Sequence, residues 1–191
     1  SRTMIPPQKQ MTGMLGHPVA ENPIDRMFDA VYAHYGLPWQ FWKSDLATEA
    51  DLALAVPALA PLGYRGFTIT VPYKVAVMPL LDELDSDVKA IGAANYVTIE
   101  KGRLVGHNND GKGVVKAIEK VVPLRGQHVV MLGAGGAGRA MAVEIAWAGA
   151  AMMTLVMRRA KQDCEAAALV EKASGVPSQR QAWQQEVEVP A

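Results

Sequence analysis

A short glycine-rich segment between residues 133 and 138 constrains the fold of this chain more than any other feature. Its sequence follows the pattern G-x-G-x-x-G. An apolar run at 128–132 precedes it, an apolar helical pattern at 139–148 follows it, and a second apolar run occupies 152–157. A strand, a glycine turn, a helix and another strand in this order predict a parallel βαβ unit.

The glycines of this turn occur where a bound phosphate group requires them. Gly133 allows the tight turn, Gly135 lets the backbone approach a pyrophosphate, and Gly138 lets the helix pack close to the strand. The helix N-terminus presents N–H groups and the positive end of its dipole to phosphates. The pattern predicts a dinucleotide site, and the alternative is a glycine turn without a function. The candidate residues are Gly133, Ala134, Gly135, Gly136, Ala137 and Gly138.

The residues after the second strand indicate which dinucleotide binds. An acidic side chain at this place commonly binds the ribose 2′-hydroxyl of NAD. This chain has Arg158 and Arg159 there and no carboxylate before Asp163. Two guanidinium groups match the charge and the geometry of a 2′-phosphate. We therefore expect NADP as the cofactor, with NAD as the alternative if both arginines are only surface residues.

Composition narrows the class of partner. The 191 residues include 19 Lys plus Arg and 19 Asp plus Glu, so the formal net charge is zero and favours neither nucleic acid nor a membrane surface. No apolar run reaches the roughly 18 residues of a membrane span. A single cysteine provides no intrachain disulfide and no cysteine-based zinc site. We expect a cytoplasmic protein with a small-molecule partner and no metal, and a homo-oligomer stays open.

Two charged residues in the front half could carry acid–base chemistry. Lys74 follows a buried strand expected over 66–71, and Asp110 stands at a glycine turn that leads into a helix. A lysine beside an aspartate can move the proton of a hydroxyl while a hydride leaves the same carbon. Spacing alone does not pair these residues, and a surface lysine and an aspartate that caps a helix are the simpler interpretations.

Five segments resemble motifs of the shikimate/quinate dehydrogenase family. Residues 16–19, 66–74, 90–95, 106–113 and 133–140 are similar to its G-x-P-I, G-x-N-V-T-x-P-x-K, A-x-x-I-G-A-x-N-T, G-x-N-T-D-x-x-G and G-A-G-G-A-x-R-A motifs. The resemblance implies NADP-dependent, reversible oxidation of a secondary alcohol on a small hydroxylated cyclic carboxylic acid. It implies Lys74 and Asp110 as the catalytic pair, and Asn95 and Thr70 as ligands of the ring hydroxyls.

One family segment is altered in this chain. The family continues its first motif as H-S-x-S-P, whose two serines hold the substrate carboxylate, whereas residues 21–25 here read E-N-P-I-D. Asn22 can still donate a hydrogen bond to the substrate and Ile24 cannot, while Glu21 and Asp25 would add negative charge if both point inward. We expect a paralogue with an altered pocket. The competing hypotheses are a catalytically silent NADP-binding or interaction protein and an NAD-dependent quinate-like dehydrogenase. Other usual family residues are also replaced, at Thr68, Tyr96 and Asn109.

The segment P-L-R-G at 123–126 is the clearest break along the chain. We therefore expect an α/β fold with a substrate-binding and catalytic domain over 1–122 and a Rossmann-type dinucleotide-binding domain over 123–191. The second domain is expected to be partial, because two strands are recognisable after residue 128 and such domains usually have six. We accordingly expect a truncated form, or a form in which another subunit supplies the missing wall of the nicotinamide site. As a monomer, the chain is expected to bind NADP weakly and to show little activity.

Overall fold

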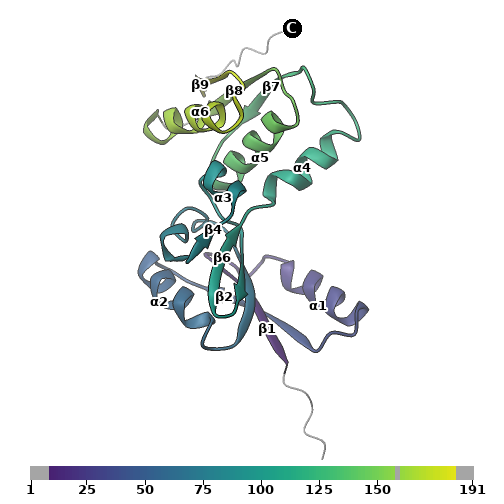
Figure 1. The fold of residues 1–191 in the computed structure, drawn as a ribbon, viewed down its shortest axis with the longest axis vertical. Helices are drawn as coiled ribbons and strands as arrows, with labels where there is room; N and C mark the ends of the chain where they lie inside the picture. The colour runs from purple at the N-terminus through teal and green to yellow at the C-terminus, as the bar shows by residue number, and fades with distance from the viewer. Residues whose placement is uncertain (1–8, 158–159, 184–191) are drawn as a thin grey trace, which may run out of the picture. The chain divides into compact units, whose positions relative to one another are not determined.

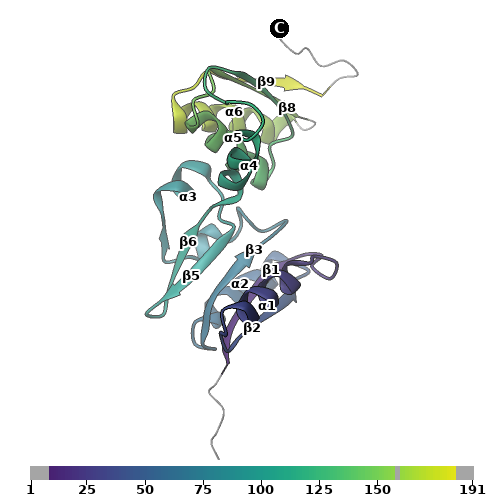
Figure 2. The same cartoon turned by 90° about the vertical axis from the view of Figure 1, so that its right-hand side faces the viewer.

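The computed structural model describes residues 9–157 and 160–183. The chain forms two compact units, one of residues 1–84 and 94–107 and the other of residues 85–93 and 108–191 (Figures 1 and 2). This division differs from the boundary expected between residues 122 and 123, because 85–93 and 108–122 pack with the second unit. The assignment of separate functions to 1–122 and 123–191 stays a prediction.

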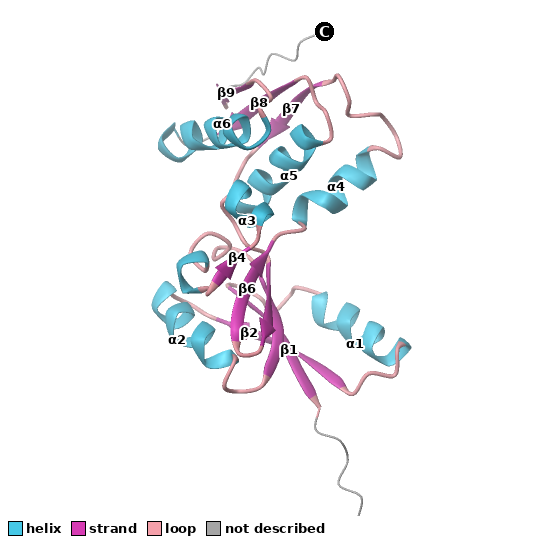
Figure 3. Ribbon diagram, viewed as in Figure 1, coloured by secondary structure: helices cyan, strands magenta, loops and turns pink. Residues whose placement is uncertain are grey.

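The first unit contains a six-stranded mixed sheet with helices on both faces (Figure 3). Its strand order is β2-β1-β3-β5-β6-β4, in which β1 runs parallel to β2 and β3, and β5 runs antiparallel to β3 and β6. The elements are β1 (Gln10–Gly16), α1 (Ile24–His34), β2 (Trp39–Asp45), α2 (Glu49–Leu59), β3 (Tyr64–Ile69), the short 3-10 helix η1 (Met78–Leu80), β4 (Glu83–Leu84), β5 (Tyr96–Glu100) and β6 (Arg103–His107).

Aromatic packing fixes α1 on this sheet. Phe28 of α1 stacks on Phe41 of β2 with ring centroids 4.5 Å apart. Tyr32, one turn further along α1, is buried and hydrogen bonds to Thr12 of β1 at 2.6 Å. The apolar positions of α1 therefore face the sheet, as the spacing of one helix face predicts.

Lys101 and Gly102 form the turn of the hairpin between β5 and β6. Glu100 pairs with Arg103 at the closed end, so the turn has two residues. Lys101 has φ 52° and Gly102 has φ 81°. Positive φ at both central residues is the geometry that joins antiparallel strands without splaying them.

The second unit contains a three-stranded parallel sheet, β7-β8-β9, with α5 and α6 on the same face (Figure 3). The expectation of only two strands after residue 128 is therefore wrong, because a third strand pairs with β8. The elements are α3 (Ser86–Ile91), α4 (Asp110–Ile118), β7 (His128–Leu132), α5 (Gly136–Trp147), β8 (Met152–Met157), α6 (Ala160–Ser174) and β9 (Ser178–Ala182).

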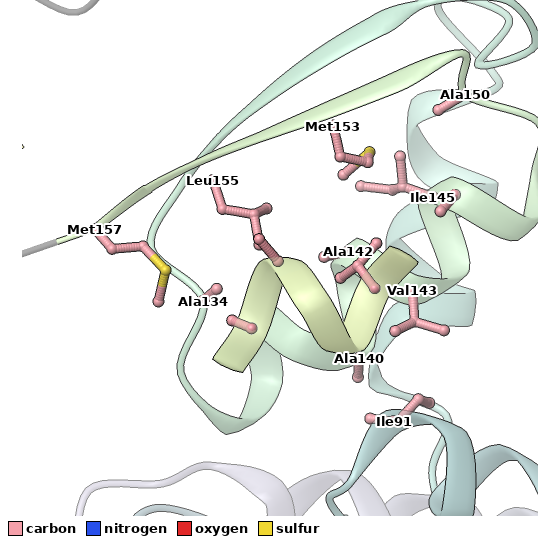
Figure 4. Close-up of a cluster of buried hydrophobic side chains, with 14 of the residues drawn as sticks. Ile91, Ala134, Ala140, Ala142, Val143, Ile145, Ala150, Met153, Leu155 and Met157 are labelled. Carbon is pink, nitrogen blue, oxygen red and sulfur yellow. The ribbon is translucent and has the colours of Figure 1, made fainter. Parts of the chain in front are cut away.

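The core of the second unit lies between this sheet and its helices. Met153 and Leu155 of β8 point toward α5, where Ala142 and Ile145 meet them (Figure 4). Ile91, from the short helix α3, is fully buried in the same cluster. Burying an aliphatic side chain of this size contributes about 1.5–3 kcal/mol, so α3 is a structural part of this unit although it is distant in sequence.

Candidate functional site

The carboxyl edge of the six-stranded sheet gathers most of the predicted site residues of the first unit. β1 and β3 run parallel, so the loops that follow Gly16 and Ile69 leave the sheet at the same edge. β5 runs the opposite way and begins at this edge, directly after Asn95. Ligands of parallel sheets bind at carboxyl edges, which makes this edge the candidate substrate site.

Thr70 is held at this edge by the neighbouring strand. Its N–H donates to the carbonyl oxygen of Leu15 at 2.9 Å, and its own carbonyl oxygen accepts from Tyr73 N–H at 3.1 Å. A Cβ at Gly16 would lie 2.1 Å from the Thr70 methyl group. Glycine at 16 therefore lets the turn that carries Thr70 lie directly against β1.

Lys74 and Asn95 are joined through the backbone beside Thr70. The carbonyl oxygen of Lys74 accepts from Ala94 N–H at 2.8 Å. Asn95 accepts from Ile69 N–H at 2.8 Å and donates to the His107 carbonyl oxygen at 2.9 Å. The side chains of Lys74 and Asn95 are half-buried. Thr70, Lys74 and Asn95, three residues predicted from the sequence, are thus brought to one place.

The loop after β1 carries Asn22, and Lys43 of β2 holds this loop. Asn22 Oδ1 accepts from Ile24 N–H at 3.1 Å. Lys43 Nζ donates to the carbonyl oxygens of Ala20 at 3.0 Å and Asn22 at 2.8 Å, and lies 3.2 Å from Asp25 Oδ2. Burial acts to raise the pKa of Asp25, but the hydrogen bond and charge of Lys43 outweigh it, so the pKa lies below its ordinary value.

His17 and Asp45 form a pair at the same edge that sequence reasoning missed. His17 Nδ1 lies 2.5 Å from Asp45 Oδ1, across the ends of β1 and β2. The hydrogen bond from His17 is the main reason that the pKa of Asp45 lies below its ordinary value. The two residues are 28 positions apart, so only the parallel pairing of β1 and β2 brings them together.

Asp110 belongs to the second unit and begins α4. The residue that caps this helix is Asn109, so Asp110 is not itself the cap. Asn108 is buried, and its Oδ1 accepts from Asp110 N–H at 3.1 Å. The hydrogen bond from Asp110 to Asn108 therefore fixes the start of α4. The pairing of the Asp110 and Lys74 side chains stays a prediction.

The glycine turn between β7 and α5 has the geometry that its sequence predicts. Gly133 has φ +91°, which L side chains rarely adopt. A Cβ at Gly138 would lie 3.0 Å from the carbonyl oxygen of Gly133, whereas one at Gly135 would meet nothing within 4 Å. Gly135 caps α5 and leaves open space beside its backbone. These residues fit the pyrophosphate of a dinucleotide. Arg158 and Arg159 directly follow β8 and lie outside the described residues.

Neither a metal cluster nor a membrane-spanning helix occurs in the described part of the chain. Over residues 9–157 and 160–183, no group of three or more His, Cys, Asp and Glu side chains is arranged to hold a metal ion. No helix in these ranges has both the length and the apolar character needed to cross a bilayer.

Comparison with known proteins supplies a family match for the front half. Residues 14–97 match the shikimate dehydrogenase substrate binding domain. A shikimate dehydrogenase (NADP(+)) from Alkaliphilus oremlandii is 35% identical over 156 residues, which cover 81% of this chain and 54% of that protein. One from Methanococcus maripaludis is 38% identical over 144 residues, 75% of this chain and 51% of that protein. The chain spans about half the length of these curated relatives.

Solved structures resemble both units. A 5-ketofructose reductase from Gluconobacter sp. strain CHM43, in its ligand-free form, is 39% identical with a TM-score of 0.86, over 96% of this chain and 66% of that one. A shikimate dehydrogenase in complex with NADP+ is 30% identical with a TM-score of 0.84, over 93% and 63%. A quinate dehydrogenase from Corynebacterium glutamicum, in complex with NAD, is 29% identical with a TM-score of 0.82, over 91% and 64%.

Proposed function

Because the chain belongs to the shikimate dehydrogenase family, we propose that it takes part in the NADP-dependent, reversible oxidation of a secondary alcohol on a small hydroxylated molecule. The observation that carries this proposal is the gathering of Thr70, Lys74 and Asn95 at one sheet edge. The glycine turn of the second unit supports it, since the open space at Gly135 fits a pyrophosphate.

Each residue has a distinct role in the proposed reaction. The glycine turn at 133–138 would hold NADP+, which would supply the hydride acceptor for the carbinol carbon. Lys74 would take the hydroxyl proton as a neutral amine while the carbonyl forms, and as the resulting ammonium it would return the proton in the reverse direction, which is general acid–base catalysis. Asp110 would orient the Lys74 ammonium and balance its charge. Asn95 and Thr70 would bind neighbouring hydroxyls and hold the reacting carbon in place.

Two substrate classes are candidates for this site. A hydroxylated cyclic carboxylic acid is favoured by the relatives named for shikimate and quinate. A ketose is favoured by the likeness to the reductase of 5-ketofructose, and by the replacement of the two serines expected in the loop after β1. In both classes the partner is a small molecule, and a homo-oligomer stays a prediction.

The test is steady-state turnover of shikimate, quinate and a ketohexose with NADP+, and of the corresponding ketones with NADPH. Lys74→Ala should lower turnover by about a hundred- to ten-thousand-fold, the usual contribution of a general acid–base group, and leave NADP affinity unchanged. Lys120→Ala, at an exposed position of the second unit, is the control and should retain full turnover.

An unchanged rate in Lys74→Ala would remove Lys74 from the mechanism. A chain that binds NADP and oxidises or reduces none of these substrates would favour the alternative, a silent NADP-binding or interaction protein on the same scaffold.

A further inference from the structure

The loop between β1 and α1 contains the positions where the family resemblance expects two serines that hold a substrate carboxylate. A carboxylate needs hydrogen-bond donors or an uncompensated positive charge to be bound out of water. The groups that this loop presents can therefore be examined one by one for their capacity to bind an anion.

Neither of the replacing side chains offers a strong anion site. Ile24 has no polar atom and packs against the cluster of Met14, Val19, Tyr32 and Phe41. Asn22 uses its Oδ1 to accept from Ile24 N–H, so only its Nδ2 group remains to bind a ligand. One neutral amide group replaces the two hydroxyl groups expected from the family.

The ammonium group of Lys43, which contacts this loop, is already engaged. An ammonium group has three hydrogens to donate, and Lys43 Nζ lies within 3.2 Å of three acceptors, the carbonyl oxygens of Ala20 and Asn22 and the carboxylate of Asp25. The Lys43 side chain is only 18% exposed. Its position holds the loop in shape, and its charge is balanced by Asp25.

The remaining charges around the loop are negative or face elsewhere. Glu21 is exposed on the loop itself. Asp45 accepts from His17 and from Val19 N–H, which keeps it ionised. Arg26 is exposed and stands two residues before Phe28, so it lies on the side of α1 that faces away from the sheet. Among the residues that the structure describes, the charged side chains around this loop therefore offer no free positive charge to bind an anion.

From this arrangement we infer that the substrate is an uncharged polyhydroxylated ketone or alcohol, with a hydroxyl, hydroxymethyl or carbonyl group where shikimate carries its carboxylate. The inference rests on the proposed function, since it concerns the substrate of that same site. Asn22 Nδ2 would donate to a neutral oxygen of this ligand, and Glu21 would repel a carboxylate.

Shikimate and its methyl ester test the inference, because they share every ring hydroxyl and differ by one charge. Calorimetric titration of the 191-residue chain saturated with NADP+ should give an affinity for shikimate about three- to tenfold weaker than for the ester, as one or two exposed charges can cause. Added salt should narrow the difference by screening the repulsion.

Two substitutions with the same change of charge separate the loop from a general effect. Glu21→Gln should improve shikimate binding and leave the ester unchanged, whereas Glu100→Gln, at the tip of the hairpin in the same unit, should change neither. Equal or tighter binding of shikimate than of the ester by the unsubstituted chain would overturn the inference and leave the dehydrogenase proposal standing. Binding of neither ligand, together with no turnover of a ketohexose, would overturn both.

Discussion

The side-chain amide of Asn108 donates a hydrogen bond to the carbonyl oxygen of Ala93 at 2.8 Å, within the second unit. Its Oδ1 atom accepts from Asp110 N–H at 3.1 Å. One buried amide therefore joins the end of the α3 segment to the start of α4. It supports the backbone that carries Asp110.

Asn108→Ala should lower the free energy of unfolding by about 1–3 kcal/mol, because the Ala93 carbonyl and the Asp110 N–H would both lose their partner. Urea unfolding monitored by circular dichroism measures this change. Gln127→Ala removes an amide from an exposed position of the same unit and should change the free energy by less than about 0.5 kcal/mol. Equal effects of the two substitutions would show that the Asn108 bonds contribute nothing.

The two glycines Gly133 and Gly135 should respond differently to alanine. Gly133→Ala places a side chain at φ +91° and should cost roughly 1–3 kcal/mol of stability. Gly135→Ala meets no neighbour within 4 Å and lies at φ −65°. It should preserve stability and weaken NADP about tenfold or more, because its methyl group occupies the space of the pyrophosphate. Urea unfolding and NADP titration of both variants measure the stability and the NADP affinity. Unchanged NADP affinity in Gly135→Ala would count against the dinucleotide site.

Arg158→Asp should discriminate between the two cofactors. It removes a guanidinium group and places a carboxylate where the 2′-phosphate is expected, so NADP affinity should fall about tenfold to a hundredfold, the range of a charged hydrogen bond. NAD affinity should change by less than about threefold, since NAD lacks that phosphate. Lys120→Asp makes a comparable charge change at an exposed position in the turn after α4. A parallel loss of both affinities would refute the role of Arg158.

Glu144 on α5 should make the second unit sensitive to pH. Its Oε1 atom is buried without a hydrogen-bond partner among the described residues, and Lys112 nearby is paired with Asp87. Burial raises the pKa of Glu144 above its ordinary value of 4.5, against an opposing effect of Lys112. The folded protein then holds this proton more tightly than the unfolded chain, so stability falls as pH rises from about 4.5 through the native pKa.

Glu144→Gln removes that titration. At pH 8 it should raise the free energy of unfolding by on the order of 1 kcal/mol, the low end of the penalty for an unsatisfied buried polar group. At pH 4 it should have little effect, because Glu144 is then neutral. Urea unfolding at both pH values measures the difference. A loss of stability at pH 8 would mean that the ionised Glu144 is stabilised by Lys112.

Much of the fold was accessible from the sequence because its elements have strong local signals. The apolar runs at 128–132 and 152–157 form strands with those bounds, and the glycine turn between β7 and α5 contains Gly133, whose positive φ favours glycine. The strand β9 lacks such a signal, since its sequence S-Q-R-Q-A is polar. It becomes a strand through pairing with β8, which is a tertiary effect that outweighs propensity.

The helix α3 was also missed, although its ends carry recognisable signals. Asp85 caps it by accepting from Val88 N–H, and Gly92 ends it at φ 71°. Six residues are too few for a helical period to stand out. In the candidate site, Thr70, Lys74 and Asn95 could be predicted from motifs, whereas Lys43 and the His17–Asp45 pair could not, because strand pairing alone places them at the edge.

The chain passes between its two units more than once, and this restricts how the protein can be divided into separate domains. Residues 85–93 belong to the second unit and interrupt the first, so the chain crosses the boundary three times. A single cut at 122/123 would separate α4 from α5, where Gly111 lies too close to the Ala140 carbonyl to admit a Cβ, and would leave Ile91 behind. The second unit, transplanted to another scaffold, would have to bring α3 with it as a separate insert, so gene fusion at one junction cannot transfer this unit intact.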